Sequence, residues 1–175
     1  MPNATAAVNP VQATGKEPIL ELFMHDILGG SNPTARPVTG LLGNIYSGQL
    51  QLGPDGLGLG FGTITVIDDV LTVQPELGSQ IVGKAQGVYV ASSADGSRQM
   101  MAFTALFEGG EYGDSLNLYG LFKIGSAMSK LSVISGTGKF KNAKGFAEVR
   151  SLIPPGQIAT NGAETLLRIT VHLKY

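Results

Sequence analysis

Ile81-Val-Gly-Lys-Ala-Gln-Gly-Val-Tyr-Val-Ala91 is the stretch that decides the fold class, together with the turn Ala94-Asp-Gly96 and the run Gln99-Met-Met-Ala-Phe-Thr-Ala-Leu-Phe107 that follow it. Both runs are short and rich in β-branched and aromatic residues, and turn residues separate them. This pattern is typical of two β-strands joined by a tight turn. The stretch therefore predicts antiparallel β-structure.

The same alternation of apolar runs with Gly, Pro, Asn and Ser clusters continues through most of the chain. It predicts strands at residues 19–28, 38–47, 59–68, 81–91, 99–107, 115–121, 130–135, 144–151 and 164–173. No segment between them shows a helical period or a capping box, so little helix is expected. The fold class is all-β.

Eight or nine strands with short turns suit an antiparallel meander that removes its edges by closing into a barrel. A barrel of about eight strands can hold one small ligand in its mouth. Residues 1–17 lack an apolar period and are expected to form a flexible tail, and residues 18–175 to form the barrel domain. The Gly-rich stretch 49–60 is expected to be the weakest part of the fold.

Composition excludes several classes of function. The 12 basic and 13 acidic residues nearly cancel, so the chain offers no overall field to attract nucleic acid or an anionic membrane. Cysteine is absent, which removes disulfides, thiolate metal ligands and cysteine nucleophiles. No run of about 18 apolar residues is present and the start is not a signal peptide, so the protein is either cytosolic or has lost a signal. The expected partner is an uncharged small molecule.

Asp26 is the strongest site candidate, because it lies inside the otherwise apolar, strand-like run Pro18–Leu28. A carboxylate in such a run must be paired, hydrogen-bonded or protonated, since burying it bare costs several kcal/mol or raises its pKa. The alternative is a structural carboxylate satisfied by backbone donors at a strand end.

Tyr89 lies between valines in a predicted strand, so it is either a core residue or a hydroxyl that faces a cavity and binds a phenol. Asp68-Asp69 ends a predicted strand. It is interpreted as a turn in preference to an acid–base pair, because strand neighbours face opposite ways. His25 faces away from Asp26 on the strand, so the two cannot act on one substrate atom. His25 is expected to be a hydrogen-bonded core histidine.

The sequence contains no complete motif for a nucleotide or a metal ion. Gly78-Ser-Gln-Ile-Val-Gly-Lys84 almost completes a phosphate-binding loop, but Ala85 and a strand-like run follow it where a Ser or Thr and a helix are needed. The two histidines, His25 and His172, have no second ligand at a metal-binding spacing. No cofactor and no metal are expected.

Four ordered blocks carry a family resemblance. They are Phe23-Met-His-Asp-Ile-Leu28, Phe61-Gly-Thr-Ile-Thr-Val-Ile-Asp-Asp69, Val82-Gly-Lys-Ala-Gln-Gly-Val-Tyr-Val90 and Ser132-Val-Ile-Ser-Gly-Thr-Gly-Lys-Phe140. From about residue 19 to its end, the chain resembles plant dirigent proteins. The phrase Met24-His-Asp-Ile-Leu-Gly-Gly-Ser-Asn-Pro-Thr-Ala-Arg36 is most similar to the branch associated with Casparian-strip lignin. That branch often carries a long Gly/Pro-rich insertion where this chain passes directly from Gln49 to Leu50.

The resemblance implies an eight-stranded antiparallel barrel of the dirigent and allene oxide cyclase type, which is usually a homotrimer secreted to the apoplast or cell wall. It implies a pocket that holds phenoxy radicals made by a separate laccase or peroxidase, so that they couple with one stereochemical outcome. The protein would then direct stereochemistry without a redox centre of its own. Other family members act on quinone methides or dehydrate isoflavanols to pterocarpans.

Carried over by position, the resemblance implies a catalytic aspartate at Asp26 and a substrate-binding tyrosine at Tyr89. The other family pocket positions fall on Ala91, Phe122, Ser129 and Thr165, with Leu167 two residues beyond the last. Phe122 and Ser129 are neutral where the lignan and pterocarpan branches have an acid and a base. Ring closure of a quinone methide needs acid–base help, so these replacements argue against ordinary lignan or pterocarpan formation.

Three functions follow from these expectations. The first is stereoselective, regioselective or atropselective coupling of phenoxy radicals derived from a monolignol or a bulkier phenol such as a terpenoid naphthol. The second is a cell-wall scaffold that organises lignin deposition. The third is a dehydratase or cyclase that acts alone on a quinone methide-type substrate.

Overall fold

The computed structural model describes residues 11–14, 17–39, 60–108 and 113–175. It contains the strands β1 Val11–Thr14, β2 Glu17–Ile27, β3 Ala35–Thr39, β4 Ile64–Thr72, β5 Ile81–Ala91, β6 Arg98–Phe107, β7 Asp114–Lys123, β8 Ser129–Thr137, β9 Lys144–Ile153 and β10 Glu164–Lys174. One short 3-10 turn, Gly138–Phe140, follows β8.

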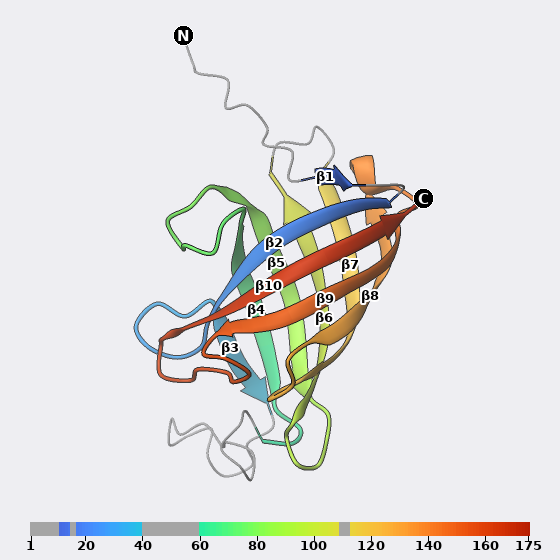
Figure 1. The fold of residues 1–175 in the computed structure, drawn as a ribbon. Coiled ribbons are helices and arrows are strands. Elements are labelled where there is room, and N and C mark those ends of the chain that lie inside the picture. Colours follow the sequence, from blue (N-terminus) through green and yellow to red (C-terminus); the bar gives the residue numbers. More distant parts are fainter. Residues whose placement is uncertain (1–10, 15–16, 40–59, 109–112) are drawn as a thin grey trace.

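Eight of these strands close into an antiparallel barrel, as Figure 1 shows. The hydrogen-bonded order runs β2-β10-β9-β8-β7-β6-β5-β4, and a short pairing of β2 with β4 closes the ring. That closing seam joins Phe23, Met24 and His25 to Thr72, Leu71 and Val70. The expected eight-stranded antiparallel barrel is therefore confirmed. β1 and β3 lie outside the ring and pair with β2 and β4.

Two strands differ most in position from the sequence-based expectation, while the other expected strands match to within about two residues at each end. The strand expected at residues 59–68 extends instead over Ile64–Thr72, so the acidic pair 68–69 lies within β4 and not in a turn. The interpretation of that pair as a strand-end turn was wrong, because the apolar alternation continues through Leu71. The strand expected at 38–47 overlaps β3 by two residues, and the rest of it lies outside the described residues, as does almost all of the Gly-rich stretch 49–60.

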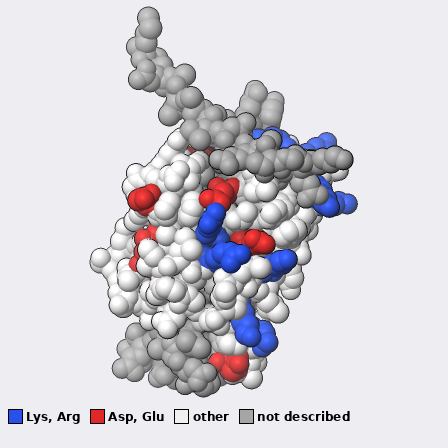
Figure 2. All heavy atoms as spheres, in the orientation of Figure 1, with Lys and Arg blue, Asp and Glu red and all other residues white. Residues whose placement is uncertain are grey.

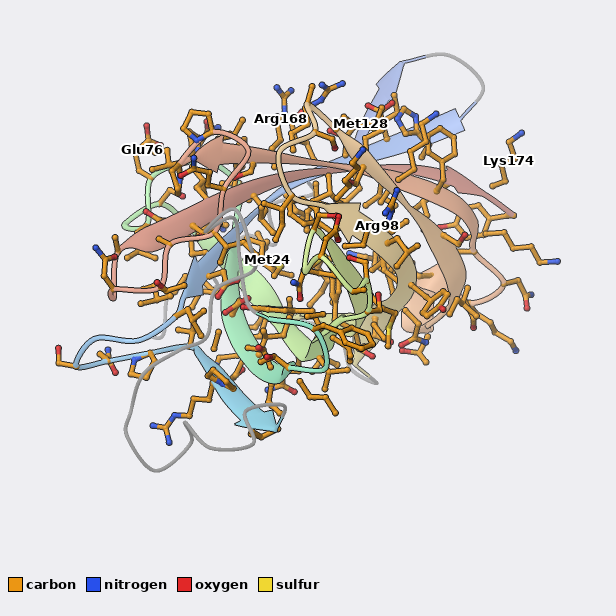
Figure 3. All side chains as sticks on the ribbon, turned by 90° about the horizontal axis from the view of Figure 1, so that it is seen from below. Met24, Glu76, Arg98, Met128, Arg168 and Lys174 are labelled. Atoms are coloured by element: carbon orange, nitrogen blue, oxygen red, sulfur yellow. The ribbon has the colours of Figure 1, made fainter. Side chains whose placement is uncertain are left out.

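The core fills the barrel because alternate residues of each strand point inward. On β2 these are Leu20, Leu22 and Met24, each at most 2% exposed. Figure 3 shows Met24 within the ring of strands, while Arg168 and Lys174 point away from it. At one end of the barrel the rings of Phe107 and Phe140 pack against each other, with centroids 5.2 Å apart.

Glycine allows close strand approach within the barrel. A Cβ atom at Gly87 would lie 2.2 Å from the carbonyl oxygen of Ala102 on β6, which is far inside van der Waals contact. The spacing of β5 and β6 at this point therefore requires glycine. This contact explains part of the high glycine content, 25 of 175 residues.

Most of the described charged residues lie on the outer surface of the strands. Figure 2 shows basic and acidic side chains next to one another on one face of the molecule. Ion pairs across neighbouring strands or along one strand include Arg168–Glu21 at 2.6 Å and Arg150–Glu148 at 3.8 Å. Among the described residues, no helix has the length and apolar character needed to cross a membrane.

Candidate functional site

A small pocket lies inside the barrel at the end opposite the Phe107–Phe140 packing. It is lined by residues of β2, β5, β6, β7 and β10 and of the connection before β10, namely Asp26, Tyr89, Gln99, Met101, Phe122, Ile158, Thr165 and Leu167. The space open to the centre of a water molecule is about 10 Å³, which is room for about one water. The pocket is therefore nearly filled by its own side chains in this conformation.

Asp26 and Tyr89 form the polar contact in this pocket. The Tyr89 hydroxyl donates a hydrogen bond of 3.2 Å to Oδ2 of Asp26. Both side chains are buried, at 3% and 2% exposure, and no hydrogen-bond partner lies near Oδ1 of Asp26 among the described residues. The alternative of a carboxylate satisfied by backbone donors does not hold, because Asp26 accepts its hydrogen bond from a phenol on another strand.

Burial controls the protonation of this pair. It raises the pKa of Asp26 from 3.8 to about 7, and the Tyr89 hydrogen bond opposes that rise. The pKa of Tyr89 is raised well above 10.0 for the same reason, so the phenol stays neutral and acts as a donor. Asp26 can therefore either accept or release a proton near neutral pH.

The structure brings together most of the site residues expected from the sequence. Phe122, Thr165 and Leu167 line the pocket beside Asp26 and Tyr89. Thr165 lies opposite Asp26 in the β2–β10 register, and its hydroxyl accepts a hydrogen bond of 2.9 Å from the backbone N–H of Ala159.

The other two expected residues do not line the pocket. Ala91 is buried at the end of β5, opposite Gln99. Ser129 begins β8, where its hydroxyl accepts a hydrogen bond of 2.9 Å from the backbone N–H of Lys123. Ser129 thus holds the β7–β8 turn, because its side chain is engaged with the backbone.

Asp69 is a buried acid behind the pocket that the sequence interpretation missed. It is fully buried, because Thr65, Ile67, Asp69 and Leu71 form the inward-facing row of β4. Thr34 donates a hydrogen bond of 2.6 Å to its Oδ1, while Oδ2 has no partner among the described residues. Burial, and next the charge of Asp26, raise the pKa of Asp69 to about 9.

Its neighbour Asp68 points the opposite way, as neighbours on a strand must. Asp68 is exposed and accepts hydrogen bonds of 3.1 Å from Lys84 and 3.0 Å from Gln86 on β5. The expectation that at most one of the two acids shares a face with the pocket is confirmed. The period-2 alternation from Thr65 to Leu71 is the signal that could have identified the inward acid.

Gln99, Met101 and Ile158 also line the pocket without having been expected. The side-chain amide of Gln99 donates to the carbonyl oxygen of Gly96 at 3.3 Å, and its Oε1 has no partner among the described residues. The pocket thus offers two buried acceptor oxygens without a donor, one on Gln99 and one on Asp26.

His25 is a hydrogen-bonded buried histidine, as expected. Its Nε2 lies 2.7 Å from the Thr72 hydroxyl, and its Nδ1 contacts the Glu164 carboxylate on the face of β2 away from Asp26. In the described ranges, His, Cys, Asp and Glu side chains form no cluster that could hold a metal ion.

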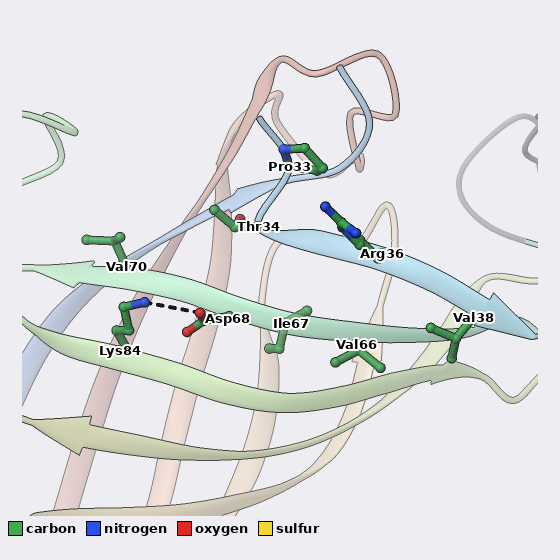
Figure 4. A pocket seen from close by; sticks show the side chains of 9 residues that line it. All are labelled: Pro33, Thr34, Arg36, Val38, Val66, Ile67, Asp68, Val70 and Lys84. Carbon is green, nitrogen blue, oxygen red and sulfur yellow. Dashed lines mark hydrogen bonds and ion pairs between the residues drawn. The ribbon is translucent and has the colours of Figure 1, made fainter. Parts of the chain in front are cut away.

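A second hollow lies on the outside of the barrel (Figure 4). This outer groove has a volume of about 490 Å³ and runs along β3 and β4. Its lining includes Thr34, Val66 and the exposed Asp68–Lys84 pair drawn in Figure 4. The groove lies across the barrel wall from the inner pocket, because Thr34 contacts Asp69 from that side.

Comparison with known proteins gives a consistent result. A family model described as Dirigent-like protein matches residues 19–174. The chain is 56% identical to Dirigent protein 18 of Arabidopsis thaliana over 226 residues, covering 98% of this chain and 91% of that protein. It is also 56% identical to Dirigent protein 16 of Arabidopsis thaliana, covering 97% and 91%. Both alignments are longer than this chain, so these relatives contain segments that it lacks.

The fold is also similar to a solved structure. The pterocarpan synthase dirigent protein PsPTS1 matches with a TM-score of 0.73 and 26% sequence identity, covering 94% of this chain and 98% of that chain. The similarity extends over the whole barrel.

Proposed function

This chain belongs to the dirigent family, and from that membership and the pocket geometry we propose that it directs the stereochemistry of phenoxy-radical coupling. A separate laccase or peroxidase would generate the radicals from a monolignol or a bulkier phenol such as a terpenoid naphthol. The barrel would hold two such rings in one relative orientation.

The observation that carries this proposal is the pair of unpartnered acceptor oxygens inside the apolar barrel. Oδ1 of Asp26 and Oε1 of Gln99 are buried polar atoms without a donor among the described residues, and such atoms are costly unless a ligand or water satisfies them. A phenol supplies one hydroxyl donor and one apolar ring, which suits an acceptor set among Met101, Phe122 and Leu167.

The binding energy needed to select one coupling orientation is small. A tenfold preference for one coupling face corresponds to about 1.4 kcal/mol, which is within the range of a single hydrogen bond to a charged group. The protein needs no redox group in this mechanism, because the oxidase performs the electron transfer and the barrel selects the geometry.

Ligand entry requires the pocket to widen, because about 10 Å³ admits no aromatic ring. Ile158 lies in the connection between β9 and β10 and Met101 is an unbranched, adaptable side chain, so these two residues are the ones whose displacement would open the pocket. The rigid strands would keep Asp26 and Tyr89 in place meanwhile.

A second candidate function is ring closure or dehydration of a closed-shell quinone methide. The buried Asp69 favours it, because acid–base chemistry needs a second proton-carrying group near Asp26. The related solved structure is named a pterocarpan synthase, which adds support for this reaction class.

We also propose that the chain forms a homotrimer that acts in the apoplast or cell wall, where dirigent proteins are generally found. An apolar band crosses the outside of the barrel. It contains the cross-strand row Val66, Val88, Ala102 and Tyr119, with exposed Leu121 beside it. Tyr119 and Leu121 are 49% and 50% exposed in the single chain, so packing against further copies would remove this surface from water.

The test is a coupling reaction that contains the protein, a laccase and one candidate phenol, read by chiral chromatography. We expect one enantiomer or atropisomer in excess, and we expect Asp26→Asn to reduce that excess while the exposed-face variant Asp68→Asn retains it. Selectivity that survives Asp26→Asn undiminished would show that Asp26 is misassigned. Racemic product from every phenol, with no turnover of a quinone methide without oxidant, would favour the scaffold function instead.

A further inference from the structure

Asp26 and Asp69 face each other at the seam where the barrel closes. The β2–β4 pairing ends at His25 opposite Val70, and the next position in that antiparallel register places Asp26 opposite Asp69. Both side chains point inward, and both are buried. The ladder itself stops at His25 and Val70, and the Thr34 backbone bonds to Ile27 and Asp68 just beyond it. The two acids therefore lie on the inner face at the end of the seam, close enough for the charge of Asp26 to raise the pKa of Asp69.

The two acids have the same pattern of hydrogen bonds. Each carboxyl group accepts one bond from a hydroxyl, Asp26 from Tyr89 and Asp69 from Thr34. Each keeps one oxygen without a donor, Oδ1 of Asp26 and Oδ2 of Asp69. In the ligand-free barrel, a single proton held between those two oxygens, directly or through one water, would satisfy both, and a phenol that enters would compete for Oδ1 of Asp26.

The surrounding charges do not stabilise two anions at this seam. Among the described residues, neither carboxyl takes part in an ion pair with Lys or Arg. Tyr89 faces the pair from β5 as a neutral donor, while Asp68 with Lys84 lies on the outer face of the wall and His25 with Glu164 on the far side of β2. Two adjacent buried carboxyl groups without a cation cannot both ionise readily.

We propose that Asp26, which lines the pocket, and Asp69, which lies behind it, hold one proton between them and act as an acid–base pair. This deepens the second candidate function, quinone methide chemistry, on which its chemical use rests, although the pairing itself does not depend on the ligand. The pair would supply acid–base help of the kind that the neutral residues Phe122 and Ser129 do not provide. The second acid comes from β4, a strand on which no pocket position was expected.

The pair could carry out a balanced proton transfer on a quinone methide. The protonated acid gives its proton to the carbonyl oxygen as the exocyclic C=C electrons return to the ring and restore aromaticity. A hydroxyl oxygen of the substrate forms a C–O bond to the methide carbon, and its proton passes to the carboxylate. The pair ends with one proton, as it began, and no oxidant or reductant is consumed.

Thr34 extends this polar chain through the barrel wall. Its hydroxyl accepts a hydrogen bond of 3.0 Å from the backbone N–H of Ile27 and donates to Asp69, and the residue also lines the outer groove. Asp69 is therefore held from the outside of the barrel, while Asp26 is held from the inside by Tyr89.

The test is a pH titration of the side-chain carboxyl ¹³C signals of the ligand-free protein, with Asp26→Asn, Asp69→Asn and Asp68→Asn as variants. In the wild type, the signals of both buried acids should respond to two coupled steps. In Asp26→Asn, Asp69 should titrate in one step. Its pKa should be lower by about one unit or more, because the negative charge of Asp26 no longer raises it. In Asp69→Asn, Asp26 should likewise show one step.

Asp68→Asn is the matched control, because it alters the adjacent residue of the same strand on the opposite face and should leave both steps in place. Backbone amide spectra establish that each variant is folded. The proposal of a shared proton would be overturned if Asp26 and Asp69 titrated in independent single steps in the wild type. It would also be overturned if Asp26→Asn left the titration of Asp69 unchanged. Because no phenol is present, racemic coupling would contradict the proposed function without contradicting the pair.

Discussion

Tyr89 on β5 donates its hydroxyl to Asp26 on β2 across the barrel interior, although β4 lies between these two strands in the sheet. The contact thus joins two points of the ring that no backbone ladder connects. It fixes the orientation of the carboxylate by side-chain chemistry alone.

Tyr89→Phe tests this contact with little change in volume. The variant removes the hydrogen bond that opposes the rise in the pKa of Asp26, so that pKa should move further above about 7. Carboxyl ¹³C titration measures the shift. The excess of one product should also fall, because Asp26 loses its fixed orientation. Tyr119→Phe, at an exposed tyrosine on β7, is the matched control and should leave the titration of Asp26 unchanged.

The two raised carboxyl pKa values also predict a pH dependence of stability. Between the ordinary value of 3.8 and the folded values of about 7 and about 9, the folded state binds more protons than the unfolded state. The free energy of unfolding should therefore fall as the pH rises from about 4 to about 9, by on the order of a few kcal/mol. Urea unfolding at a series of pH values measures this slope.

Asp69→Asn should flatten the slope, because the amide does not titrate. Asp68→Asn should leave it in place, since Asp68 is exposed and the hydrogen bonds from Gln86 and Lys84 lower its pKa. A wild-type protein whose stability rises over this pH range would contradict the assigned burial of both acids.

Much of this site could be predicted from sequence because its residues lie in regular strands. Asp26 stood out as an acid in an apolar run, and Tyr89 as an aromatic in an alternating one. Inside a barrel, the period of two places both side chains on the inner face without knowledge of the rest of the chain. The closed eight-stranded ring followed from strand number and turn length in the same way.

The partnership of Asp26 with Asp69 could not be predicted in that way. It depends on the register of β2 against β4, two strands that are far apart in sequence and meet only because the barrel closes. It also depends on where β4 ends, and the acidic pair at 68–69 was mistaken for that end. Ile158 was missed because it lies in a connection, where no period indicates which residue faces the pocket.

Thr34→Val removes the hydroxyl that holds Asp69. The Thr34 hydrogen bond opposes the rise in the pKa of Asp69, so without it that pKa should rise further. The variant also leaves the backbone N–H of Ile27 without its acceptor, which should lower the free energy of unfolding by about 1–3 kcal/mol. Thr34→Ser keeps the hydroxyl and should behave like the wild type in both carboxyl titration and urea unfolding. If Thr34→Val and Thr34→Ser gave the same pKa of Asp69 and the same free energy of unfolding, the Thr34 hydroxyl would not hold Asp69.

The apolar outer band predicts how the assembly can be broken. Leu121→Asp places a charge on exposed apolar surface of β7, so it should prevent burial of this band between copies while leaving the barrel folded. Light scattering after size-exclusion chromatography should show a trimer for the wild type and a monomer for the variant. Thr170→Lys is the matched control, because it adds a charge to the outer face of β10, and it should remain a trimer. A wild-type monomer, or dissociation by both substitutions alike, would contradict the assignment of this band as the interface between copies.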